Sequence, residues 1–198
     1  MGRKAREERQ ERREDVVAKR SKEKRKTILM TAAILALIAA IAGYSSYVFV
    51  TMDASVPGAP PGAGKLGDEH VHSSILVRIF GDKFDFSVPS YQIKNSWIHF
   101  EDSDGTTIHR HSSGVTLGYL FDSINIGIDS KCFVFPDGRQ FCTNEDYSLK
   151  YYINHQSVDS IYDYVLEDDD RILISFGPET PEEIEEQLIE LDSQIIKG

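Results

Sequence analysis

The sequence predicts an α+β protein in which a single transmembrane helix precedes a β-rich outer domain with one central helix and a C-terminal helix. Three observations predict this class. Residues 27–50 contain no charged residue. Residues 70–176 repeatedly alternate apolar and polar positions between turns rich in Gly and Asp. Two segments, 115–126 and 181–195, change to the helical period.

The charge of the chain is divided unevenly along its length. Residues 1–26 hold twelve of the 22 basic and six of the 32 acidic residues, a surplus of +6, and the rest holds ten and 26, a balance of −16. An outer part this acidic repels nucleic-acid phosphates, so we expect no nucleic-acid partner. We expect residues 1–26 to form a basic cytoplasmic tail beside a membrane of anionic lipid.

Residues 27–50 predict the membrane span. These 24 uncharged residues rise about 1.5 Å each and are long enough to cross a hydrocarbon core of roughly 30 Å. The basic run Lys24–Lys26 precedes them, which places the N-terminus in the cytoplasm and the remainder outside the cell membrane. The alternative is a signal peptide cleaved after Ala42. The apolar run continues beyond that point, which favours the anchor. Both interpretations place the remainder of the chain outside the cytoplasm.

A spacer and a folded domain follow the span. Residues 53–68 contain three prolines and four glycines, a composition typical of a flexible linker, here assigned to 51–68. The outer domain is expected at 69–177 and an amphipathic helix at 178–198. Its hairpins are predicted from alternating segments on either side of turn residues: 70–79 with 83–86, 96–100 with 106–111, and 131–135 with 139–143. Further strands are predicted at 148–154 and 171–176.

Capping residues delimit two helices of the outer part. Thr116 precedes the first helix as N-cap and Gly127 follows it as the residue after the C-cap. Thr180, Pro181 and Glu183 begin the second in the order of a capping box. Its apolar stripe comprises Ile184, Leu188, Leu191 and Ile195. Strands, one helix and more strands that end in a buried-type strand resemble the β-grasp (ubiquitin-like) arrangement.

Histidine placement is the most unusual feature of the sequence. All six histidines lie in the outer part, and four form the His-x-His pairs His70/His72 and His109/His111. Residues i and i+2 of a strand point to the same face, so each pair projects two imidazoles together. Neutral imidazole is a common ligand of copper and zinc. The expected metal ligands are therefore His99, His109 and His111, with His70 and His72.

The register of one hairpin decides whether His99 belongs with the others. If its loop is 102–106, His99 faces His109 and three imidazoles share one face. If the loop is 102–105, His99 faces Ile108 and the cluster breaks. The sequence leaves both registers open, and strand histidines are often only surface residues. Glu101, Asp102 and Asp104 are candidate oxygen ligands or partners of the ligands, and His155 falls in a predicted turn.

Cys132 and Cys142 are the only cysteines. With a three-residue turn between their strands they lie opposite each other, and outside the cytoplasm such a pair is expected to form a structural disulfide. Nine residues separate them, so the Cys-x-x-Cys spacing of thiol-disulfide enzymes is absent. A dinucleotide fingerprint, a P-loop and a Gly-x-Ser-x-Gly elbow are also absent from the sequence.

Several segments resemble a known family. They are His70-Val71-His72, SILVRIFGDKFDFS at 74–87, WIHFEDSDGTTIHRHSSGVTLG at 97–118 and DDDRILISFG at 168–177. Over roughly residues 66–195 the chain resembles a family of single-span, His-rich extracytoplasmic proteins of ammonia-oxidising archaea (Thaumarchaeota), some of which are labelled protein-disulfide-isomerase-like. The resemblance implies an archaeal cell surface near copper-rich metabolism and supplies no ligand set.

The expected function is metal handling or an accessory role, with copper or zinc held by the histidines of a membrane-anchored domain. One alternative is a non-catalytic structural or interaction module with a surface protein partner. The other is a thiol-disulfide protein, which the missing Cys-x-x-Cys disfavours. No pattern in the sequence identifies catalytic residues or an organic cofactor.

Overall fold

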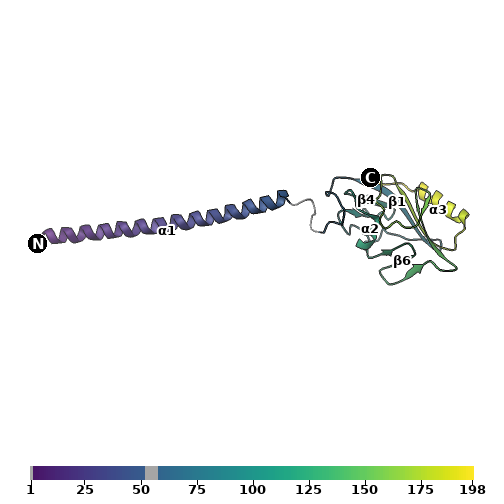
Figure 1. Cartoon of the computed structure of the whole chain (residues 1–198), viewed down its shortest axis with the longest axis horizontal. Helices are drawn as coiled ribbons and strands as arrows, with labels where there is room; N and C mark the ends of the chain where they lie inside the picture. The colour runs from purple at the N-terminus through teal and green to yellow at the C-terminus, as the bar shows by residue number, and fades with distance from the viewer. Residues whose placement is uncertain (1, 52–57) are drawn as a thin grey trace. The chain divides into compact units, whose positions relative to one another are not determined.

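The computed structural model describes residues 2–51 and 58–198 and divides the chain into two compact units, Met1–Asp53 and Ala54–Gly198. The first contains α1 (Gly2–Thr51), one unbroken helix (Figure 1). Its stretch Arg12–Val48 includes a segment long and apolar enough to cross a membrane. The basic residues predicted as a tail belong to this same helix, because no helix-breaking residue separates them from the apolar run.

The predicted linker ends against the outer domain. Its residues 52–57 lie outside the described residues. From residue 58 onward the backbone contacts the domain: Gly67 N–H donates to the carbonyl of His111 at 2.6 Å. The carboxylate of Asp68 accepts hydrogen bonds from the backbone N–H and the hydroxyl of Ser113, both at 2.8 Å. These contacts hold the chain beside the strands that carry the histidines.

The outer domain is built on a mixed sheet with the strand order β3-β4-β1-β10-β8-β9. The central neighbours β1 (Val71–Ile79) and β10 (Arg171–Gly177) run parallel, and the other pairs are antiparallel. The remaining strands are β3 (Ile98–His99), β4 (Thr107–Arg110), β8 (Ser148–Ile153) and β9 (Gln156–Val158), and β2 (Asp82–Lys83) pairs with β1. The structure therefore confirms an α+β class with a mixed sheet.

A small second sheet joins β5 (Gly127–Ile128), β6 (Cys132–Val134) and β7 (Gln140–Cys142). The predicted hairpins are present with shorter strands. β5 and β9 are additions, too short to show an alternating pattern in the sequence. Gly127 lies in β5 and does not end the preceding helix as predicted. Asn125 has the left-handed conformation there, with φ 58°, which Asn tolerates better than most residues.

The two helices of the domain cover opposite faces of the main sheet (Figure 1). Helix α2 (Leu117–Ser123) begins at Thr116, whose hydroxyl accepts from Tyr119 N–H, and packs into the larger apolar core. Helix α3 (Pro181–Ser193) begins with the predicted capping box and packs on the other face against Leu76 and Leu173. Ile195, predicted to belong to its stripe, is 79% exposed because the helix ends at Ser193.

Candidate metal centre

Strand register brings five of the six histidines onto one face of the sheet. His99 pairs with His109 across β3 and β4, and His109 pairs with His72 across β4 and β1. Directly opposed residues of antiparallel strands share a face, so these three imidazoles form a row. His70 directly precedes β1 and His111 directly follows β4, and their rings contact those of the row on the same face. We call these five residues the histidine cluster.

The turn between β3 and β4 sets this register. The structure has the register in which His99 faces His109, so the alternative that breaks the cluster is wrong. Asp104 fixes the turn: its carboxylate accepts from Thr106 N–H at 2.8 Å and from the Thr107 hydroxyl at 3.1 Å. Asp102 and Ser103 take the left-handed conformation, each with φ 55°. These local bonds favour the longer turn over the shorter one.

The rings of the histidine cluster are in contact with one another. The centroid of His70 lies 4.6 Å from those of both His72 and His111, and His72 lies 4.8 Å from His109. His99 lies 4.9 Å from His111 and 6.2 Å from His109. One ring nitrogen each of His70, His72 and His109 lie within 4.8 Å of one another. A modest movement of these rings would bring their nitrogens around one ion.

The solvent exposure of the side chains varies across the histidine cluster. His99 and His109 are buried, at 7% and 6% exposure, and His70 is exposed. Among the residues that the structure describes, six buried side-chain polar atoms lack a hydrogen-bond partner, and two of them are His72 Nε2 and His109 Nδ1. Leaving a buried polar atom unpaired costs about 1–3 kcal/mol. The histidine cluster therefore contains two buried ring nitrogens that could bind a metal ion.

Neighbouring groups hold His99 in one tautomer. Its Nδ1 lies 2.8 Å from the carbonyl oxygen of Asn95, which can only accept, so this nitrogen carries a proton. The side chain of Asn95 fixes that turn by accepting from the backbone N–H groups of Trp97 and Ile98. Nε2 of His99 is directed at Glu101 Oε2, 3.1 Å away. A backbone carbonyl on one ring nitrogen is a common arrangement behind a metal-bound histidine.

Burial and charge set the protonation of the cluster. Burial lowers the pKa of His109 below its ordinary value, against the opposing charge of Glu101. Burial and the neighbouring imidazoles of His99 and His70 lower the pKa of His111. Burial opposes ionisation of Glu101, but the hydrogen bond from His99 and the imidazole of His109 outweigh it and hold its pKa below the ordinary range. His109 and His111 therefore favour the neutral form, which binds metals.

The other predicted site residues lie apart from the cluster. His155 is in the turn between β8 and β9, where its Nε2 contacts Asp192 at 2.9 Å. Cys132 and Cys142 are joined in a disulfide across β6 and β7 of the small sheet. Asn95 was missed by sequence reasoning, because a single Asn in a turn gives no sign of which side chain its carbonyl will meet.

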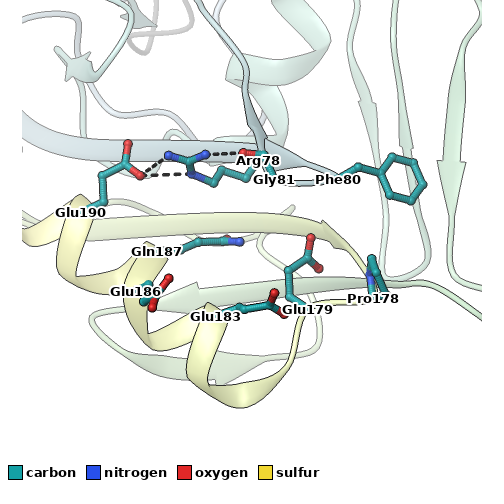
Figure 2. A pocket seen from close by; sticks show the side chains of 9 residues that line it. All are labelled: Arg78, Phe80, Gly81, Pro178, Glu179, Glu183, Glu186, Gln187 and Glu190. Atoms are coloured by element: carbon teal, nitrogen blue, oxygen red, sulfur yellow. Dashed lines mark hydrogen bonds and ion pairs between the residues drawn. The ribbon is translucent and has the colours of Figure 1, made fainter.

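A pocket of about 420 Å³ lies elsewhere, between the end of β1 and α3, and shares no residue with the cluster (Figure 2). Arg78 crosses it and binds Glu190 and the carbonyl of Gly81. Gln187 lines it, is 7% exposed and has an unpartnered Oε1. Figure 2 shows the remaining wall, formed by Phe80, Pro178, Glu179, Glu183 and Glu186. Glu190 and Glu179 are already paired with Arg78 and Lys150, so the acceptors that suit a cationic side chain are those of Glu186 and Gln187.

Comparison of the chain with protein-family models, with curated proteins and with solved structures finds no match. The geometry of the site therefore carries the functional argument.

Proposed function

We propose that this protein is a membrane-anchored metal-binding protein whose outer domain holds copper or zinc in the histidine cluster. The observation that carries the proposal is the convergence of five imidazoles from three strands on one sheet face, with buried ring nitrogens left unpartnered. An apolar residue in place of His109 would avoid the cost of a buried nitrogen without a hydrogen-bond partner, so the imidazole is better explained by a ligand than by packing.

The donor atoms of the histidine cluster favour Zn²⁺ or Cu²⁺. Imidazole nitrogens suit both ions, and a nearby carboxylate adds a harder donor. Both cysteines are used in the disulfide of the other sheet. No thiolate is therefore available to the cluster, which disfavours the sulfur-rich sites that select Cu⁺.

The proposal includes a location and a finer fold. The basic residues that precede the apolar part of α1 support a cytoplasmic N-terminus and an extracytoplasmic domain. A disulfide agrees with an oxidising compartment. The parallel central pair β1 and β10, flanked by antiparallel strands and with α2 inserted between β4 and β8, supports the β-grasp-like arrangement.

Metal titration of the full chain in detergent tests this function. We expect near-stoichiometric uptake of Zn²⁺ or Cu²⁺, measured by calorimetry and by metal analysis after gel filtration. A variant with His99→Ala, His109→Ala and His111→Ala should lose it. His155→Ala removes a histidine outside the cluster and should bind as the parent does. Binding no tighter than about 10 μM in the parent chain would refute the proposal.

A second candidate is an interaction module that binds a basic segment of a surface protein. The pocket beside α3 favours it, because its wall is rich in glutamates and the Gln187 acceptor is unpartnered. A Glu183→Gln, Glu186→Gln variant separates the two functions: it should leave metal uptake unchanged and weaken binding of an Arg-rich peptide, followed by fluorescence anisotropy. An equal peptide affinity in parent and variant would remove this candidate.

A further inference from the structure

Glu101 faces two different histidines with its two oxygens. Its Oε2 lies 3.1 Å from His99 Nε2, and its Oε1 lies 3.3 Å from His109 Nδ1. The contact with His109 does not have the geometry of a hydrogen bond, since His109 Nδ1 remains unpartnered. The carboxylate is half-buried, at 32% side-chain exposure, between two buried rings. One carboxylate thus connects two parts of the cluster.

The two separations are close to those of donor atoms that share a metal shell. Metal–nitrogen and metal–oxygen bonds of about 2.0–2.2 Å in a tetrahedral shell place neighbouring donors about 3.3–3.6 Å apart. The 3.3 Å separation at His109 lies at the edge of this range and the 3.1 Å separation at His99 lies just below it. His99 Nδ1 donates to Asn95, so Nε2 faces Glu101 Oε2 with a proton when it donates the hydrogen bond, and with a lone pair once that proton is lost. A lone pair and a carboxylate oxygen repel each other unless a cation or a proton lies between them.

The five imidazoles also divide into two groups. His70, His72 and His109 have ligand atoms within 4.8 Å of one another. His99 and His111 form a second group, with ring centroids 4.9 Å apart and 6.2 and 6.5 Å from the His109 ring. His111 also borders the first group, because its ring lies 4.6 Å from that of His70. A single tetrahedral ion takes four donors, which leaves part of this set unused.

We propose that the histidine cluster holds two metal ions bridged by Glu101, one bound by His70, His72 and His109 and the other by His99 and His111. This inference rests on the proposed function. Oε1 of Glu101 completes a four-donor shell at the first ion, and Oε2 gives the second ion a third protein donor. The second ion therefore keeps an open position, the arrangement that distinguishes reactive metal sites from structural ones.

Stoichiometry tests this inference without any variant. The full chain in detergent, saturated with Zn²⁺ and passed through a desalting column, should retain two zinc ions per chain by elemental analysis. One ion per chain would overturn the two-ion centre and leave the proposed function intact. No retained zinc, together with no binding in the titration, would overturn both.

Variants then assign each ion. His72→Ala and His99→Ala remove donors from different groups, so each should retain one zinc ion. Glu101→Gln replaces the bridging ligand and should weaken binding of the second ion at least tenfold, since loss of even an outer-shell carboxylate costs about 10–100-fold in metal affinity. Glu145→Gln, which neutralises an exposed glutamate outside the histidine cluster, is the matched control and should retain two. Equal affinities for both ions in Glu101→Gln and Glu145→Gln would overturn the bridge.

Electron paramagnetic resonance of the Cu²⁺-loaded parent chain tests the bridge independently of folding in variants. Two Cu²⁺ ions joined by a carboxylate couple magnetically, so the integrated signal should account for fewer spins than copper ions. A signal that accounts for one spin per copper would show separate ions and overturn the bridged centre.

Discussion

One face of the main sheet has two halves with opposite character. Along β1, His72, Ser74 and Leu76 point to this same face. Leu76 packs with Leu173 under α3 and is 1% exposed. His72, two positions before Ser74, belongs to the histidine cluster, and Ser74 marks the boundary, where its hydroxyl contacts Gln194 just after α3 ends.

The difference shows what packing alone explains. In the half covered by α3, every buried apolar residue contacts apolar partners, and burial accounts for the residues found there. Within the described chain, both halves contain buried polar atoms without a hydrogen-bond partner, Ser175 Oγ and Gln187 Oε1 beside α3 and His72 Nε2 and His109 Nδ1 in the histidine half. Only in the histidine half do these atoms belong to side chains that bind metals, so apolar packing accounts for most of the first half and a bound ion would satisfy the second.

The largest loss of stability is expected when a side chain is removed from the half covered by α3. Leu173→Ala deletes a fully buried side chain and leaves a cavity beneath α3, which should lower the free energy of unfolding by about 2–5 kcal/mol. Chemical denaturation followed by circular dichroism measures it. Ile189→Ala, at a residue of α3 that is 59% exposed, should lower the free energy of unfolding far less. Equal losses would mean that α3 does not cover a packed core.

Metal addition should stabilise the histidine half by a comparable amount. At a free Zn²⁺ concentration one hundred times Kd, the gain is about 2.7 kcal/mol, or roughly 5–10 °C in Tm. His109→Leu removes a ligand of the first ion and should reduce this gain. It should also raise the stability of the metal-free chain by about 1 kcal/mol, because a buried nitrogen without a hydrogen-bond partner is replaced by an apolar group. Thermal unfolding with and without Zn²⁺ measures both. A metal-free His109→Leu chain less stable than the parent would contradict this account.

Acid should destabilise the histidine half selectively. The pKa values of His109 and His111 are lowered by folding, so the unfolded chain binds their protons more readily. Their contribution to stability is complete above the ordinary imidazole pKa near 6.5 and decreases as pH falls below it. The Tm of the metal-free chain should therefore fall between pH 7 and pH 5.5. A His109→Leu, His111→Leu variant should show a smaller fall in Tm over this pH range. A fall as large as that of the parent chain would show that these two histidines are not its cause.

The smallest expected effect concerns how α3 begins. Thr180 accepts a hydrogen bond from Glu183 N–H in the capping box, so Thr180→Ala should cost about 1 kcal/mol. Thr180→Ser keeps the hydroxyl and should cost much less. Neither should change zinc affinity, since α3 covers the other half of the face. Denaturation curves and zinc titrations of both variants provide the comparison.

Local patterns predicted the elements of this fold well and its longer-range features less well. Alternation and turn residues indicated the hairpins, and Thr180 with Glu183 indicated where α3 begins, because these signals lie within a few residues. The end of α3 was placed too late, since Ile195 continues the apolar spacing although the helix has already ended. The parallel pairing of β10 with β1 depends on contacts about a hundred residues apart, which no local period encodes.

The candidate site was predictable in composition and not in geometry. The His-x-His pairs indicated shared faces, and the structure places His70, His72, His99, His109 and His111 together. The register of β3 and β4 was left open because it depends on bonds made by Asp104 inside the turn. The role of Glu101 between two rings follows from that register and could not be derived before it was known.

The spacing between His99 and His109 also limits how the gene can change. Nine residues separate the paired histidines, and surface loops usually accept insertions and deletions with little harm. Here the gain or loss of one codon would exchange the two faces of β3, presenting Ile98 where His99 now lies and turning an imidazole into the apolar core. Changes of two codons preserve the pairing. Among functional descendants, this loop is therefore expected to vary in length by even numbers of residues.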